Sequence, residues 1–272
     1  MAVSVNSALS VTFWGVRGSI ACPEPEMLRY GGNTSCLEVR CGDHLLIFDA
    51  GTGLRPLGRK LAEAGEVDAD LFLSHTHFDH VSGLPFFGPA FVPKNRFRFW
   101  AGHLEAQGLE LCDVLCEMMM PPLFPVPIEI FKADIAYKDF VAGATLVPRP
   151  GVVLKTAPLN HPNGATGYRI EYGGRSICYV TDTEHTGQGP DETILGLIDG
   201  ADIVIYDATY TDEEYPKFKG WGHSTWQEGI RVCEAAGAKR LVIFHHDPSH
   251  DDAFMDGIAA AAEKRRIGTL VA

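Results

Sequence analysis

The chain has 272 residues, of which 46% are hydrophobic and 21% are charged, which is the composition of a globular protein with a sizeable core. Its formal net charge of −12, without any run of Lys or Arg, argues against binding to long nucleic acids, because polyanions are repelled. The first residues do not resemble a targeting signal and no stretch of 18 apolar residues occurs, so we expect a cytoplasmic protein without a membrane span.

Apolar runs bounded by turn residues predict strands that alternate with helices along the chain. In the first part, strands are expected at 9–15, 35–41, 44–51 and 70–75, and helices at 54–65 and 103–120. In the second part, strands are expected at 151–161, 165–174, 175–182, 201–209 and 239–246, and helices near 191–198, 224–236 and 251–265. Since no linker or low-complexity tract divides the chain, the pattern predicts one domain over residues 1–272, an α/β sandwich with helices outside the sheet.

Five of the predicted strands end in a residue that can bind a metal ion. These strand-end residues are Asp49, His75, His161, Asp182 and His245. Each one alone is more often a turn former or a helix cap. Five together at the ends of strands, where α/β folds build their sites, indicate one shared site.

The stretch HTHFDH at 75–80 holds three of the 11 histidines of the chain, directly behind a predicted strand. Past the strand, His75 and His77 can point the same way, while Asp79 and His80 reach a neighbouring point. Imidazole nitrogen and carboxylate oxygen suit Zn²⁺, and also Mn or Fe. The motif therefore predicts two adjacent divalent metal ions, and the alternative is a set of solvated loop residues.

This motif resembles the loop that defines the metallo-β-lactamase superfamily, in which a later His, a bridging Asp and a final His complete the site. The matching positions are His161 in PLNHPNG, Asp182 in YVTDTEH and His245 in VIFHHDP. The resemblance implies a four-layer αββα sandwich, with two mixed sheets and helices on the outer faces.

The resemblance also implies how two metal ions would be held. One would be bound by His75, His77 and His161, the second by Asp79, His80 and His245, and Asp182 would bridge them. His246 is an alternative to His245, which we prefer because it closes the predicted strand. Asp49 in LIFDAG matches an aspartate that orients a ligand histidine, or it is only a strand-end turn former.

A second group of residues resembles the phosphodiesterase branch of this superfamily, which includes the tRNA 3′-processing endonucleases. Asp207-Ala-Thr and Gly222-His-Ser-Thr match its acid-Ala-Thr and His-Ser-Thr pair, in which a glutamate positions the histidine that protonates the leaving oxygen. Here Asp207 is one methylene shorter, and His223 would be the proton donor. An alternative is that Thr225 simply caps the following helix, with Glu228 at capping-box distance. Dizinc lactamases commonly carry Cys where this chain has Asp182, which argues against β-lactam hydrolysis.

Together these residues predict a dinuclear metallohydrolase that cleaves a phosphodiester in a small substrate such as a cyclic nucleotide. A hydroxide that bridges the metals would be the nucleophile, and His223, Asp207 and Asp79 are the expected catalytic residues. The alternatives are a lactone or thioester hydrolase on the same metals, and a non-catalytic, metal-dependent nucleotide sensor.

Other segments bear on the substrate. Only 20 residues separate His161 from Asp182, where the resembling tRNA-processing enzymes usually insert a tRNA-gripping arm, so tRNA is disfavoured. The apolar, Pro-rich sequence between His80 and His161 could wall off a pocket, form the face of a homodimer or belong to the core. Arg17 and Asn33 lie in Gly-bearing turns that could meet a phosphate, or they have ordinary turn roles.

Overall fold

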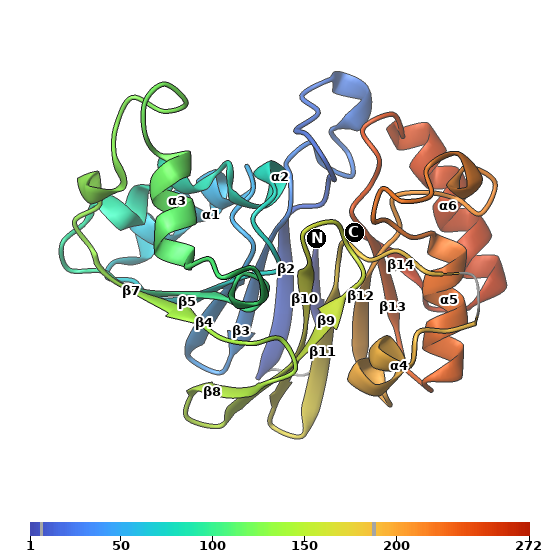
Figure 1. The fold of residues 1–272 in the computed structure, drawn as a ribbon. Helices are drawn as coiled ribbons and strands as arrows, with labels where there is room; N and C mark the ends of the chain where they lie inside the picture. The colour runs from blue at the N-terminus through green and yellow to red at the C-terminus, as the bar shows by residue number, and fades with distance from the viewer. Residues whose placement is uncertain (6–7, 187–188) are drawn as a thin grey trace.

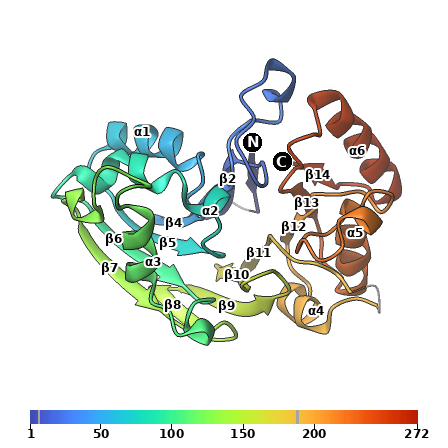
Figure 2. The same cartoon turned by 45° about the horizontal axis from the view of Figure 1, so that its top comes forward.

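The computed structural model describes residues 1–5, 8–186 and 189–272. Within these ranges the chain forms two seven-stranded mixed sheets that face each other, with helices on both outer faces (Figures 1 and 2). The predicted four-layer αββα sandwich is therefore confirmed.

The first sheet contains the N-terminal strands in chain order. Its strands are β1 (Ala2–Ser4), β2 (Leu9–Gly15), β3 (Cys36–Cys41), β4 (His44–Phe48), β5 (Asp68–Leu73), β6 (Arg96–Ala101) and β7 (Asp134–Asp139). Strands β1 to β4 pair antiparallel, and β4 to β7 pair parallel. The helices of this half are α1 (Leu54–Ala64), α2 (Phe78–Val81) and α3 (Leu111–Met118), joined by the 3₁₀ turns η1 (Pro25–Met27), η2 (Leu84–Phe86), η3 (Gly88–Phe91), η4 (Glu105–Gln107) and η5 (Ile128–Ile130).

The second sheet has the mirrored order, from β14 back to β8. Its strands are β8 (Thr145–Arg149), β9 (Val152–Leu159), β10 (Ala165–Tyr172), β11 (Arg175–Val180), β12 (Ile203–Asp207), β13 (Leu241–Phe244) and β14 (Leu270–Val271). Strands β8 to β11 pair antiparallel, and β11 to β14 pair parallel. It is covered by α4 (Glu192–Ile198), α5 (Trp226–Ala235) and α6 (Asp252–Arg265), and η6 (Tyr215–Lys217) lies before α5.

The core between the sheets is rich in aromatic side chains. Phe48 stacks on Phe72 with ring centroids 5.2 Å apart, and Tyr168 of the second sheet packs edge-on against Phe48 at the same distance. Strand β5 is buried on both faces, since Phe72 points to the other sheet while Leu71 and Leu73 pack under the helices. This explains why its sequence is a continuous apolar run instead of an alternating one.

Several elements differ from the sequence prediction. Strands β1, β6, β7, β8 and β14 were not predicted. The helix expected over 103–120 begins only at Leu111, because the preceding 3₁₀ turn ends at Gly108, whose φ of 69° is left-handed. Helix α5 begins at Trp226, and Thr225 caps it by accepting a hydrogen bond from the Glu228 N–H, so the capping role proposed for Thr225 is realised.

Among the described residues, no helix is long and apolar enough to span a bilayer. The single domain over residues 1–272 stays a prediction, and one cooperative unfolding transition by both fluorescence and circular dichroism would support it.

Candidate metal centre

The HTHFDH motif lies in the turn between β5 and α2. His75 follows the end of β5, His77 is the residue before α2, and Asp79 and His80 lie within its single turn. His75, Asp79 and His80 are buried. The short helix turns the chain back toward the sheet, so all four side chains face the ends of the second-sheet strands.

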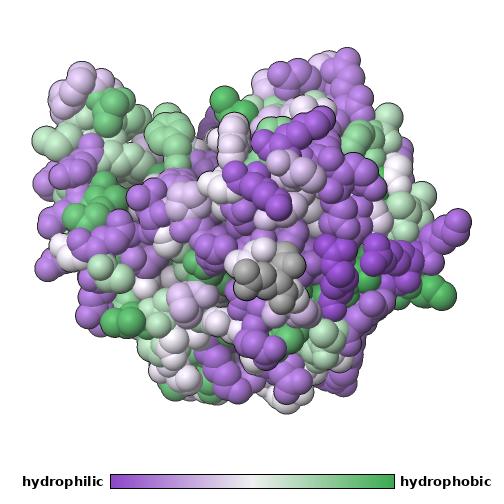
Figure 3. Space-filling view, turned by 45° about the vertical axis from the view of Figure 1, so that its right-hand side comes forward, coloured by the Kyte–Doolittle hydropathy of each residue, from purple (hydrophilic) through white to green (hydrophobic). Residues whose placement is uncertain are grey.

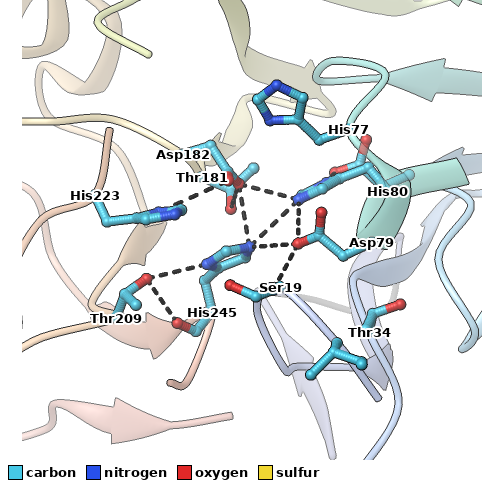
Figure 4. A network of polar contacts seen from close by, with 12 residues as sticks. Ser19, Thr34, His77, Asp79, His80, Thr181, Asp182, Thr209, His223 and His245 are labelled. Carbon is cyan, nitrogen blue, oxygen red and sulfur yellow. Dashed lines mark hydrogen bonds and ion pairs between the residues drawn. The ribbon is translucent and has the colours of Figure 1, made fainter. Parts of the chain in front are cut away.

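Side chains from both sheets converge there in two groups. The first contains His75, His77 and His161, and the second contains Asp79, His80, Asp182 and His245. In the second group, the Nε2 atoms of His80 and His245 are 3.3 Å apart, and Asp79 Oδ2 lies 3.2 and 3.3 Å from them (Figure 4). Ligands 2.0–2.1 Å from a tetrahedral zinc ion lie about 3.3 Å from each other. The spacing in this group therefore fits one metal ion.

Asp182 lies between the two groups and presents one carboxylate oxygen to each. Its Oδ1 atom is 3.8 Å from His75 Nε2 and 3.8 Å from His161 Nε2. Its Oδ2 atom is 3.2 Å from His80 Nε2 and 3.4 Å from His245 Nε2. This is the arrangement of a carboxylate that can bridge two cations.

The hydrogen bonds around two of the histidines engage Nδ1 and leave Nε2 as the nitrogen that can bind a metal. His80 Nδ1–H donates to Asp49 Oδ2 at 2.8 Å, and His161 Nδ1–H donates to the Gly222 carbonyl at 2.8 Å, so in both rings Nε2 faces the cluster. His75 Nε2 is buried without a hydrogen-bond partner among the described residues. An orphaned buried nitrogen near the carboxylate between the two groups fits a divalent cation, and so does the whole donor set of imidazoles and carboxylates.

Asp49 holds His80 in place from behind. Its buried carboxylate also accepts hydrogen bonds from the Ser74 N–H at 2.7 Å and from the Tyr179 hydroxyl at 2.7 Å. The expected contact between Asp49 and a ligand histidine is thus observed. The backbone at Gly222, which receives His161, has a φ of 86°, and a Cβ there would lie 2.3 Å from His161 Nδ1. Only glycine fits this position.

Three of the strand-end residues have left-handed backbones. Asp49, Asp182 and His245 have φ values of 61°, 54° and 64°. A non-glycine residue in this region costs about 1 kcal/mol or more, and such residues concentrate at functional sites. The sharp turn directs each side chain away from its strand and into the shared site.

Charge in the cluster is balanced between acids and imidazoles. Burial favours neutral Asp182 and Asp79, but the imidazoles around them, His80 and His245 above all, outweigh burial and hold both carboxyl pKa values well below the usual range. Burial also lowers the pKa of His80, and the carboxylates of Asp79 and Asp182 more than reverse this. At His75 burial prevails and the pKa is lowered. The two carboxylates are therefore ionised and can attract cations.

A second pair of side chains lies against this cluster. His223 Nδ1–H donates to Asp207 Oδ2 at 3.0 Å, and the His223 ring stacks on that of His245 with centroids 5.0 Å apart. Burial alone would lower the pKa of His223, but the Asp207 carboxylate raises it to about 9. Despite its shorter side chain, Asp207 reaches His223, because its carboxylate lies directly at the end of β12. His223 and His77 lie on either side of Asp182 (Figure 4).

The structure separates the two adjacent histidines after β13. His245 faces the cluster, whereas His246 Nε2 bonds the Ala272 carbonyl at 3.0 Å and lies away from it. His245 Nδ1 is itself 3.0 Å from the Thr209 hydroxyl, which donates to Asp207 at 2.7 Å. Thr209 thus connects a candidate ligand to the carboxylate that holds His223.

Two other contacts were not anticipated from the sequence. The Ser19 N–H donates to Asp79 Oδ2 at 2.8 Å, and His77 Nε2 lies 3.3 Å from Asn163 Oδ1. Ser19 carries no motif, so no local signal could identify it. The contact of Thr209 with Asp207 could have been inferred in part, since an Asp side chain commonly accepts from the backbone N–H two residues on, as it does here at 3.1 Å.

Arg17 and Asn33 make structural contacts within the protein, and their contact with a phosphate stays a prediction. The guanidinium of Arg17 is buried and donates to the carbonyls of Gly31 at 2.9 Å and of His250 at 2.6 Å, with longer contacts to two more carbonyls. Asn33 Oδ1 accepts from the Thr52 hydroxyl at 3.2 Å. Arg17 therefore fastens the loop that follows His245 and His246.

Comparison with known proteins agrees with this geometry. Residues 44–246 match the family described as "Beta-lactamase superfamily domain". The chain is 34% identical to Ribonuclease Z of Brevibacillus brevis, over 76% of each chain, and 28% identical to Ribonuclease Z of Halorubrum lacusprofundi, over 88% of this chain and 86% of that one.

Solved structures show the same fold. The metallo-β-lactamase fold protein YhfI from Bacillus subtilis has a TM-score of 0.71 at 18% identity, covering 97% of this chain and 95% of that one. Human tRNase Z, short form, has a TM-score of 0.65 at 23% identity, covering 87% and 92%. The family match spans most of the chain and includes the clustered residues from His75 to His245. The chain belongs to the β-lactamase superfamily, and it is a metal-dependent hydrolase.

Proposed function

We propose that the protein hydrolyses a small phosphodiester, such as a cyclic nucleotide or a related ester, with two divalent metal ions, zinc in first place and Mn or Fe as alternatives. One observation carries this proposal: the His223–Asp207 pair lies directly against a cluster that can hold two cations. The metal cluster alone would fit several classes of hydrolase. A further histidine, His223, held by the Asp207 carboxylate, suits a substrate whose leaving oxygen needs a proton.

The geometry supports the following division of the ligands between two metal ions. His75, His77 and His161 would hold the first, Asp79, His80 and His245 the second, and Asp182 would bridge them. When bound, two such cations supply a deprotonated water as nucleophile and neutralise the phosphate oxygens.

The chain itself supplies the proton and the orientation. Water oxygen forms the new P–O bond, the P–O bond to the leaving group breaks, and His223 gives its Nε2 proton to the departing oxygen. Asp207 accepts the Nδ1–H and keeps the imidazole protonated. Proton donation of this kind contributes about 10²–10⁴ in rate. Asp79 is held by the Ser19 N–H, so its carboxylate keeps a fixed position during the reaction.

An RNA substrate is the second candidate, because the relatives named above are ribonucleases. Two observations favour the small substrate. Strands β10 and β11 are joined by a tight turn at Gly173 and Gly174, which leaves no place for an inserted arm between His161 and Asp182. The net charge of −12 also repels a polyanion.

The test combines metal analysis with a substrate panel. Protein loaded with zinc, manganese or iron is assayed on bis(p-nitrophenyl) phosphate, cyclic nucleotides, a lactone, a thioester and a tRNA with a 3′ extension. We expect two metal ions per chain and turnover of the small diesters. Two bound metals with turnover of the lactone or thioester alone would overturn the proposal, as would nucleotide binding that is never followed by hydrolysis.

A further inference from the structure

An apolar pocket of about 560 Å³ lies beside the metal centre. We call it the aromatic pocket, and the residues that matter here are His77, Phe78, Phe86, Met118, Leu123 and Phe124. Its wall is formed by α2, η2, α3 and the segment after α3, so part of the Pro-rich sequence between His80 and His161 does line a pocket. Other apolar residues of that sequence, such as Phe87 and Phe97, belong to the core.

The aromatic pocket adjoins the metal centre, because His77 belongs to both. One ring nitrogen of His77 faces His161 in the metal centre at 3.0 Å, and the residue also lines the pocket. His223 is on the other side of Asp182 (Figure 4). A diester whose leaving oxygen meets His223 would therefore direct its other substituent toward His77 and the pocket.

The lining of the pocket is uncharged and exposes large apolar side chains. No Asp, Glu, Lys or Arg occurs among the described residues that line it. Leu123 is 79% exposed, Phe78 is 73% exposed and Phe86 is 57% exposed, although each would be expected to avoid water. Figure 3 shows apolar side chains gathered at the upper left, near the segment after α3, whereas the face over α5 and α6 is mainly hydrophilic.

We propose that the aromatic pocket binds an uncharged aromatic substituent of the phosphodiester, on the side away from the leaving oxygen. Phe86 and Phe124 pack edge to face with centroids 6.0 Å apart, an arrangement that leaves aromatic faces and edges for a third ring. A nucleobase fits less well, since its polar edges would find few partners in this lining. The inference rests on the proposed function and narrows its substrate class from small phosphodiesters in general to aryl diesters, in place of cyclic nucleotides.

The test uses diesters that share p-nitrophenol as leaving group and differ only in the retained substituent: methyl, phenyl, 2-naphthyl or thymidine-5′-yl. Each kcat/KM is divided by the rate of the uncatalysed reaction. We expect the naphthyl ester to exceed the methyl ester by about 10- to 100-fold, from burial of the ring.

Matched variants test whether the preference for the naphthyl ester arises in the aromatic pocket. Leu123→Asp places a charge in the pocket and should lower the ratio of the naphthyl rate to the methyl rate about tenfold. Ile267→Asp makes the same change at a residue that is 88% exposed and outside the pocket lining. This control should alter neither the naphthyl preference nor the rate on the methyl ester. Phe86→Ala should lower the preference without adding charge.

A second readout does not depend on catalysis. Ligand-observed NMR should detect 2-naphthol binding to the metal-free protein and to Ile267→Asp, and lose it with Leu123→Asp. If no diester is turned over but this binding pattern holds, the proposed function fails and the pocket assignment stands.

Three results would overturn the inference. One is equal normalised rates for methyl and naphthyl esters, and another is a preference for the thymidine ester. The third is that the protein is a dimer, and that Leu123→Asp converts it to monomers without changing the naphthyl preference. A second copy of the chain would then be the occupant of the pocket.

Discussion

His223 Nδ1 lies 3.0 Å from Asp207 Oδ2, and the Thr209 hydroxyl joins the other oxygen of this carboxylate to His245. The candidate proton donor and a candidate metal ligand are thus held by one buried acid. This connection distinguishes a leaving-group role for His223 from that of a solvated loop histidine.

The substitution His223→Ala should slow hydrolysis by an amount that depends on the leaving group of the substrate. For a diester that releases an alcohol, we expect kcat to fall by about 10²–10⁴, because the alkoxide then departs without a proton. For a p-nitrophenyl ester the loss should be small, since that oxygen leaves readily as an anion. Equal losses on both substrates, with metal content unchanged, would contradict the role of proton donor.

The same role predicts an alkaline limb in the pH profile. His223 donates only when protonated, and its pKa is raised to about 9 in the metal-free protein, so the protonated form is present at neutral pH and is lost as pH rises. Bound cations repel the proton, which places the limb below 9. We expect kcat for an alcohol-releasing diester to fall along this limb in the unsubstituted enzyme. A profile of the same shape in His223→Ala would show that another group titrates.

The adjacent histidines after β13 give a matched pair for metal binding. His245→Gln should reduce the metal content from two ions toward one per chain, measured by elemental analysis after dialysis, because the second group loses an imidazole. His246→Gln should retain both ions, since His246 bonds the Ala272 carbonyl and its amide replacement can still donate there. The opposite pattern would assign the ligand to His246.

Arg17→Met should destabilise the protein by about 2–5 kcal/mol in urea unfolding, because buried carbonyls lose a charged donor. Arg55→Met, at an exposed position of α1, is the control and should stay within about 0.5 kcal/mol. If Arg17→Met kept its stability and lost activity, the phosphate contact considered from the sequence would be favoured instead.

The positions of the site residues were predictable because strand ends carry a clear signal. Apolar runs end at Asp49, His75, Asp182 and His245 or close to them, and parallel strands bring such ends together. Strands β7 and β8 gave no such signal, since they are largely exposed or half-buried and lack a clear apolar alternation.

Contacts made across the chain could not be predicted in this way. Ser19 reaches Asp79 over 60 residues, and Arg17 reaches His250 over 233. Both contacts depend on the position of a loop, which the packing of the two sheets determines. The choice of His245 over His246 was predictable, because His245 closes the strand, and the left-handed turn there directs its side chain into the cluster.

The mirrored strand order divides the ligands between two halves of the chain. Residues 75–80 belong to the half that ends with β7, whereas His161, Asp182 and His245 belong to the half that begins with β8. The connection between the halves turns at exposed Gly143. A chain severed at this turn yields two fragments, each with an incomplete set of ligands. Reassembly of the two fragments should therefore be favoured by metal ions, because each pair of cations would bind ligands from both fragments, and a chelator should reverse it.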